Sequence, residues 1–171
     1  MTYLDSSTES LSNKCQSARY ITERLRGSNP VPGTKFRVKW AEELRCLTGV
    51  YVRRWYIETA WFSIRLHHWL HSDDARAHHD HPWDFITIIL RGGYSDVTAE
   101  GVQKMHPGKI AFRRAEHSHT VQVNPEGCWS FLLTGPQKRR WGFWVGRKWK
   151  KSNKYFLEHG MHVCSGGEAT K

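Results

Sequence analysis

The first residues in this chain that could do chemistry are histidines near its middle. His79 and His81 lie two residues apart in the stretch from His78 to Phe85, which is followed by the apolar run 86–90. On an extended strand this spacing places both imidazoles on one face, about 6.6 Å apart along the backbone. Neutral imidazole is the commonest protein ligand for iron, zinc, copper and nickel. The pair therefore indicates one half of a metal site.

A second His-x-His pair, His117 and His119, lies downstream and opens another alternating stretch. In a small barrel, the inward-facing residues of neighbouring strands converge. We therefore expect His79, His81 and His119 to form a metal-binding face of three nitrogens. Such a set leaves positions open for water, oxygen or substrate, whereas a structural zinc site is closed by four protein ligands.

A competing ligand set lies on the opposite face of the same strand. His78 and Asp80 match the His-x-Asp half of the two-histidine, one-carboxylate triad of iron, 2-oxoglutarate-dependent oxygenases. His119 would complete that triad, and Arg91 or Arg140 would bind the carboxylate of 2-oxoglutarate. The apolar alternation of the residues that follow favours the first set.

The composition indicates one globular domain with a basic surface. The chain has 171 residues, of which 39% are hydrophobic, and nine tryptophans that predict a core or binding wall of large flat side chains. A net charge of +10 is compatible with nucleic acid, phosphorylated metabolites or an acidic partner. Residues 138–151 interleave basic and aromatic side chains, as single-stranded nucleic acid requires. We favour a structural role for those aromatic residues, so nucleic acid is not the favoured partner.

The cysteines and the N-terminus indicate a cytoplasmic protein. No Cys-x-x-Cys pair occurs, and we interpret the four widely spaced cysteines as reduced thiols. The N-terminus lacks a basic region followed by an apolar core, so no secretory signal is predicted. No apolar run approaches the ~20 residues that a membrane span needs, and we expect no membrane association.

The pattern divides the chain into three segments. Residues 1–33 are predicted to be a helical appendage and linker, because apolar side chains recur there at helical spacing. Residues 34–157 alternate in short stretches punctuated by Gly and Pro, which predicts an antiparallel sandwich or barrel. Residues 158–171 are expected to be a tail. The helical stripe consists of Leu11, Cys15, Ala18, Ile21 and Leu25.

Two turns and one strand face are specific expectations within the barrel. Gly92-Gly93 and the stretch 124–127 are predicted to be turns. Residues 59–70 are predicted to form a strand with Ile64, Leu66 and His68 on its apolar face. Strands are predicted at 35–40, 50–57, 59–70, 84–90, 94–99, 109–112, 119–123, 128–133 and 140–145.

Several motifs together resemble those of the cupin superfamily. They are His79-x-His81, Arg91-Gly92-Gly93, His106-Pro107-Gly108 and the stretch 115–119. The stretches 81–85, 91–94 and 134–143 further resemble small cupins of bacteria and bacteriophages, and the resemblance spans roughly residues 50–150. It implies an all-β fold with a single cupin barrel, which is a jelly-roll or double-stranded β-helix. For a viral protein, the compartment would be the host cytoplasm.

The resemblance also implies a ligand set. His79 and His81 match the paired ligands of the first cupin motif, and His119 matches the single histidine of the second. The implied cofactor is a divalent metal, with Fe(II) first and Mn, Ni or Zn as alternatives.

The fourth cupin ligand is missing from its usual place. The family has a glutamate four or five positions after the second histidine, and this chain has Phe85 and Ile86 there. Asp84, on a bulged strand, or His117 is the candidate replacement. The resemblance therefore implies a three-histidine site, more open and more positively charged, as in cysteine-dioxygenase-like cupins.

The function predicted from these residues is that of a mononuclear non-haem metal dioxygenase acting on a small, anionic substrate. Arg65, Arg91 and Arg140 are candidates to bind that anion, and Trp83 to wall the pocket. The alternatives are the 2-oxoglutarate oxygenase above, a non-catalytic ligand- or nucleic-acid-binding cupin, and a sugar-nucleotide isomerase or epimerase. A homodimer is also expected, because cupins often dimerise through edge strands.

Overall fold

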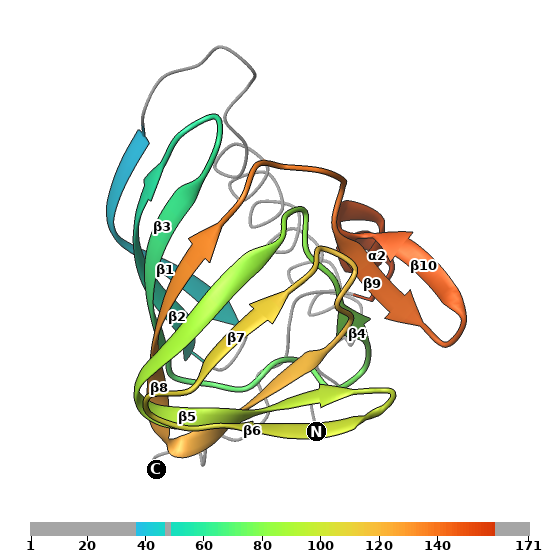
Figure 1. The fold of residues 1–171 in the computed structure, drawn as a ribbon. Coiled ribbons are helices and arrows are strands. Elements are labelled where there is room, and N and C mark those ends of the chain that lie inside the picture. Colours follow the sequence, from blue (N-terminus) through green and yellow to red (C-terminus); the bar gives the residue numbers. More distant parts are fainter. Residues whose placement is uncertain (1–36, 47–48, 160–171) are drawn as a thin grey trace, which may run out of the picture.

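Two antiparallel sheets form the body of the molecule in the computed structural model, which describes residues 37–46 and 49–159 (Figure 1). The larger sheet has the strand order β1-β2-β3-β8-β5-β6, with β7 also pairing with β5, and the smaller has the order β10-β9-β4. The elements are β1 (Arg37–Cys46), β2 (Gly49–Glu58), β3 (Ser63–Trp69), β4 (His78–His79), β5 (Phe85–Thr98), β6 (Gly101–Met105), β7 (Ile110–Arg113), β8 (Thr120–Thr134), β9 (Gly142–Val145), β10 (Lys148–Lys151) and α2 (Ser152–His159).

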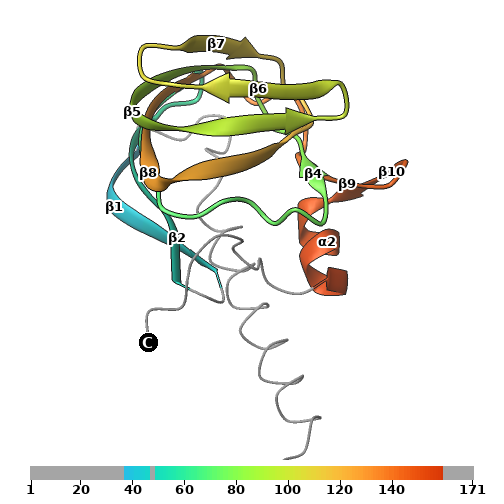
Figure 2. The same cartoon turned by 90° about the horizontal axis from the view of Figure 1, so that it is seen from below.

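The all-β prediction is confirmed by this topology. The large sheet curls so that β5, β6, β7 and β8 lie above the short strand β4, and α2 lies beside the small sheet (Figure 2). The predicted appendage at residues 1–33 lies outside the described residues, as does the tail from residue 160. Strand β10 and helix α2 were not predicted from the sequence. In the part of the chain that the structure describes, no helix has the length and apolarity to cross a membrane.

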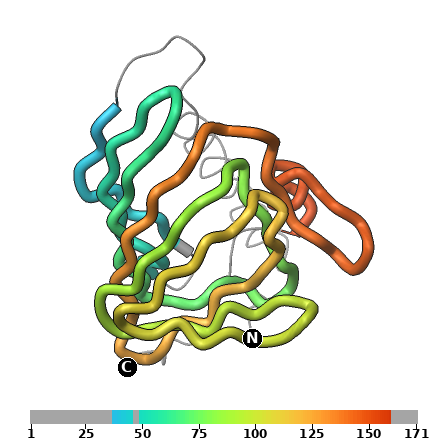
Figure 3. Tube along the Cα trace, viewed as in Figure 1, coloured from blue at the N-terminus to red at the C-terminus, as the bar shows by residue number. Residues whose placement is uncertain are grey.

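The predicted Gly92-Gly93 turn is wrong, because both glycines lie inside β5. Register shifts flank them where β5 pairs with β8, and the strand bends there instead of reversing (Figure 3). Gly92 has φ +68°, and a Cβ atom on it would collide with the carbonyl oxygen of Gly127. Glycine permits both the left-handed backbone and the close approach of the two strands. The turn predicted at 124–127 likewise lies within β8.

The polar face of β3 points into the barrel, contrary to the usual polarity of a sheet. Ser63, Arg65 and His67 are buried, whereas the apolar Ile64 and Leu66 face outward. Ser63 pairs with Glu58 on β2 and with Thr134 on β8, and both are buried, so the polar wall continues across neighbouring strands. An interior lined by buried hydroxyl, guanidinium and imidazole groups is typical of a ligand cavity rather than of a packing core.

Apolar packing is concentrated in three clusters of buried residues. The first joins β5, β6, β7 and β8, and includes Ile89 and Met105. The second packs the small sheet against α2 through Phe143 and Tyr155. The third joins β1 to β2 and includes Leu44, Tyr51 and Val52. These clusters hold the strands that carry the histidine motifs.

Candidate metal centre

The backbone pairs the two histidine motifs directly. His79 and His119 form an antiparallel bridge, in which each backbone N–H donates to the carbonyl of the other at 2.8 and 3.0 Å. The N–H of His81 donates to the carbonyl of Ala115 at 2.9 Å, which extends the pairing by two residues. Side chains two residues apart on an extended strand share a face. The three imidazoles are therefore brought to one side by local backbone hydrogen bonding.

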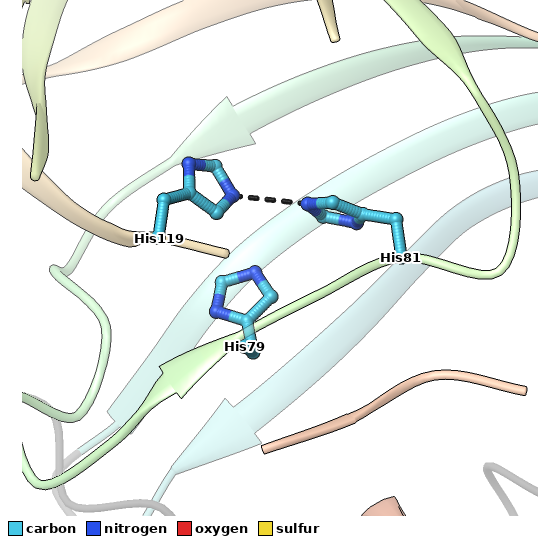
Figure 4. A group of neighbouring side chains, drawn as sticks. All are labelled: His79, His81 and His119. Atoms are coloured by element: carbon cyan, nitrogen blue, oxygen red, sulfur yellow. Dashed lines mark hydrogen bonds between the residues drawn. The ribbon is translucent and has the colours of Figure 1, made fainter. Parts of the chain in front are cut away.

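The three rings form a nearly regular triangle (Figure 4). Their centroids are 5.1 Å apart for His79 and His81, 4.8 Å for His79 and His119, and 5.1 Å for His81 and His119. One nitrogen of each ring lies within 4.8 Å of the others, and the Nε2 atoms of His81 and His119 are 2.9 Å apart. Two nitrogens bound at right angles to one ion with bonds of about 2.1 Å are about 3 Å apart. The donor set therefore fits a single divalent metal.

The protonation state of His81 also fits a ligand. Burial, together with the neighbouring imidazoles of His79 and His119, lowers the pKa of His81 well below its ordinary value. The ring is therefore neutral at physiological pH, and a histidine must be neutral to donate a lone pair to a metal.

Two carboxylates orient these rings, and neither was identified from the sequence. The Nδ1 atom of His119 lies 2.6 Å from Oδ1 of Asp96 on β5, and Nδ1 of His79 lies 3.4 Å from Oδ2 of Asp73. A carboxylate at Nδ1 selects the tautomer whose Nε2 carries a lone pair. Both aspartates are isolated in sequence from the histidine motifs, so only the fold reveals them.

Asp96 remains charged despite its burial. Burial alone would raise the pKa of its carboxyl group, but hydrogen bonds from His117 and His119 outweigh burial and hold that pKa well below the ordinary range. Arg113 adds two further hydrogen bonds, from Nε at 3.0 Å and from a terminal nitrogen at 2.9 Å. The result is a buried, anchored anion behind His119.

His117 does not join the three-histidine group as a fourth ligand. Its Nε2 atom lies 3.2 Å from both carboxylate oxygens of Asp96. Asp96, His117 and His119 form a second group of mutually close donor atoms. The carboxylate in that group is already engaged by Arg113, so the all-nitrogen group is the better metal-binding candidate.

Asp84 does not reach the three-histidine group either. Its Oδ1 accepts the backbone N–H of Ala115 at 2.9 Å, and its Oδ2 contacts Nζ of Lys138 at 2.5 Å. The next residue, Phe85, is buried, and its ring lies edge-on to His81 with centroids 4.6 Å apart. An apolar ring thus stands beside the histidines where the family has a carboxylate.

The alternative set of His78, Asp80 and His119 is not assembled among the described residues. Asp80 is fully buried and accepts hydrogen bonds from the backbone of Gly142 at 2.7 Å and from Nε1 of Trp149 at 2.8 Å. A terminal nitrogen of Arg139 lies 3.1 Å from Oδ2 of Asp80. Asp80 therefore ties β9 and β10 to β4 and has a structural role.

A cavity of about 180 Å³ opens beside the three histidines, and β2 and β3 form its polar wall. The hydroxyl of Tyr56 and both ring nitrogens of His67 are buried there and have no hydrogen-bond partner among the described residues. Burial lowers the pKa of His67 well below its ordinary value, so this ring is neutral. Buried polar atoms are nearly always paired, so these three atoms are available to a water molecule or a ligand in the cavity.

Arg65 lines the same wall and supplies positive charge to it. Its Nε donates to Oγ of Ser63 at 2.7 Å, and its guanidinium lies between the rings of Tyr56 and Trp83, 5.2 and 5.1 Å from their centroids. Glu58 is its nearest carboxylate, at 3.6 Å. Burial lowers the pKa of Arg65 to about 10, so the group is still charged at neutral pH.

The two other predicted anion-binding arginines lie outside this cavity. Arg91 is exposed on β5 and does not line it. Arg140 is exposed and lines an outer cleft of about 620 Å³, together with Trp61 and Lys138. The cleft and the cavity share Glu58, Arg65 and Trp83. Trp83 therefore stands between the two spaces.

Two aromatic residues of the basic and aromatic run at 138–151 have structural contacts. Phe143 is buried and stacks on Tyr155 with ring centroids 4.0 Å apart. Trp149 donates to Asp80, as described above. Trp144 and Trp149 are nevertheless 39% and 36% exposed.

The large antiparallel sheet curls, and the small sheet closes it. Both histidine motifs lie at one end of the cavity between them. The motifs implied this arrangement. The fold is the curled antiparallel barrel that the resemblance to cupins implied. No protein-family model and no curated protein sequence matches this chain.

Solved structures with a similar fold include three bacterial proteins. The EutQ protein of Clostridium difficile has a TM-score of 0.47 and 14% identity, covering 58% of this chain and 80% of that one. The polyketide cyclase RemF from Streptomyces resistomycificus has a TM-score of 0.47 and 15% identity, covering 74% and 91%. KdgF from Halomonas sp. has a TM-score of 0.41 and 14% identity, covering 52% and 82%.

Proposed function

We propose that this protein is a cupin-type mononuclear non-haem metal enzyme of the oxygenase class, with Fe(II) as the first candidate metal. The observation that carries the proposal is the triangle of three imidazoles, backed by Asp73 and Asp96 and facing a polar cavity. Mn, Ni and Zn suit the same nitrogen donors.

Separate sets of residues would hold the metal and the substrate. His79, His81 and His119 would bind the metal, while Asp96 and Asp73 fix the tautomers of two of them. A redox-active metal bound there would supply open positions for oxygen and substrate. Three neutral ligands leave the positive charge of the ion uncompensated, which favours an anionic substrate.

The opposite wall of the cavity has the groups to bind a small anion. Arg65 offers a buried positive charge, and Tyr56 and His67 offer buried hydrogen-bonding atoms that have no partner within 37–46 and 49–159. A volume of about 180 Å³ corresponds to roughly six water molecules, which suits a small carboxylic acid. Any larger part of the substrate would extend past Trp83 into the outer cleft beside Lys138 and Arg140.

The proposal is tested by oxygen uptake of the iron-loaded protein with a panel of small carboxylic acids. We expect one of them to stimulate uptake, and we expect Arg65→Met to raise its KM while iron content is unchanged. Arg91→Met is the matched control, because Arg91 is exposed outside the cavity. Metal binding without stimulated uptake by any acid would contradict the oxygenase proposal and would favour a non-catalytic ligand-binding protein.

A further inference from the structure

The outer face of the large sheet carries an unbroken row of apolar side chains. The row is defined by the strand register, in which each residue is the direct partner of the next on the neighbouring strand. It crosses six strands from β1 to β7. Its members are Val38, Ile57, Ile64, Leu133, Ile86 and Phe112.

A second apolar row runs beside the first, two residues further along each strand. It crosses five strands and consists of Trp55, Leu66, Phe131, Ile88 and Ile110. The stacked pair of Trp55 and Trp129, with centroids 5.6 Å apart, extends the apolar surface toward a third row. Neither of the two rows contains a charged residue. We call these eleven residues the outer apolar face.

Much of this face is accessible. Phe112 is 58% exposed at one end of the first row and Val38 is 54% exposed at the other, and Ile110 is 62% exposed in the second row. A sheet with one face in water normally turns its polar residues outward. Here the polar residues Ser63, Arg65 and His67 occupy the inside instead. Contiguous exposed apolar patches of this extent mark interaction sites.

We propose that the outer apolar face is the interface between two copies of this chain. Six strands at about 4.8 Å span about 29 Å, and two to three rows span about 14–20 Å, which gives about 400–600 Å² in plan before side-chain relief. Stable interfaces bury about 800 Å² on each partner, so the face approaches the required size. Two such faces pack as the sheets of a sandwich do, and a two-fold axis makes the same surface self-complementary.

The other candidate cover is the chain's own N-terminal segment. Its sequence offers a single stripe of five apolar side chains at helical spacing, at Leu11, Cys15, Ala18, Ile21 and Leu25. Five side chains, two of them small, are too few to cover eleven residues that include Trp55, Phe112 and Phe131. A second copy provides an equal apolar area.

Sedimentation equilibrium of the full chain tests the interface. We expect the wild type to be a dimer at roughly 10 µM, and Ile86→Glu to weaken the dimer by about 100-fold or more, because two carboxylates would be buried without partners. Phe112→Glu, at the exposed edge of the face, is the second variant in case the central substitution prevents folding. Val102→Glu on β6 is the matched control, since Val102 is 60% exposed but lies outside both rows.

Either of two results would overturn this interface. The first is a wild type that stays monomeric at roughly 100 µM. If Phe112→Glu accelerates proteolysis within residues 1–33 of that monomer, this segment is the cover. The second is a dimer that Ile86→Glu and Phe112→Glu leave intact while circular dichroism shows native folding.

Discussion

The Nδ1 atom of His119 lies 2.6 Å from the buried carboxylate of Asp96, a residue 23 positions earlier in the chain. This contact orients the ring so that Nε2 faces His81.

Asp96→Asn keeps the shape of the side chain but removes the charge that stabilises the required tautomer of His119. We expect metal affinity to fall by about 10- to 100-fold, measured by competition with a chelator of known affinity. Glu126→Gln, an exposed carboxylate, should change nothing. Equal affinity in Asp96→Asn would show that the carboxylate has no role at the metal.

Asp80 distinguishes the two ligand registers. Its oxygens accept from Gly142 and Trp149 and pair with Arg139, so Asp80→Asn leaves buried donors facing an amide NH₂. We expect the free energy of unfolding to fall by about 3 kcal/mol in urea titrations, with no loss of bound metal from the folded protein. Loss of metal with unchanged stability would instead support a triad of His78, Asp80 and His119.

His67 should be dispensable for folding, although it is buried. Neither ring nitrogen has a hydrogen-bond partner among the described residues, so His67→Leu removes an unpaired polar group from the interior. We expect the free energy of unfolding to stay the same or to rise by up to about 1 kcal/mol, while substrate affinity falls. His68→Leu, on the outward face beside it, is the control for substrate affinity. A destabilisation of more than about 2 kcal/mol would show that His67 has a packing role.

The sequence was informative where the chemistry is local and uninformative where it depends on long-range pairing. The spacing of His79, His81 and His119 predicted three residues that the fold indeed brings together. Asp73 and Asp96 were missed because no spacing motif links either of them to the histidines, which they reach only through the fold.

Two features of the fold also escaped the sequence patterns. Glycine pairs are common in turns. Nothing in the sequence near Gly92 shows that the carbonyl of Gly127, on the neighbouring strand, would approach it. The alternation in β3 correctly separated its two faces. The pattern did not show that the polar face is the buried one, because that depends on the cavity inside the barrel.

Cys128 gives the fold a dependence on alkaline pH. Burial, reinforced by Glu126, raises the pKa of its thiol from 9.0 to about 12. Because the folded state holds the proton more tightly, its stability is fully present below pH 9 and declines as the unfolded thiol ionises. Between pH 8 and pH 10 the free energy of unfolding should fall by about 1.4 kcal/mol from this group.

Urea titrations at the two pH values measure this decline, with Cys128→Ala as the comparison. The variant lacks the titrating thiol, so its pH dependence should be shallower by that amount. Identical slopes in the two proteins would show that the thiol ionises as easily in the folded chain as in the unfolded one.

The central claim is that His79, His81 and His119 hold one metal ion, and elemental analysis of untagged protein tests it most directly. After loading with Fe(II) under argon and desalting, the wild type should retain about one ion per chain, and His79→Ala/His81→Ala should retain almost none. His78→Ala/His106→Ala is the matched control, because it also removes two imidazoles but lies outside the three-histidine group, and it should retain the ion. Equal metal content in the wild type and in His79→Ala/His81→Ala, whether near one ion or near none, would contradict the account.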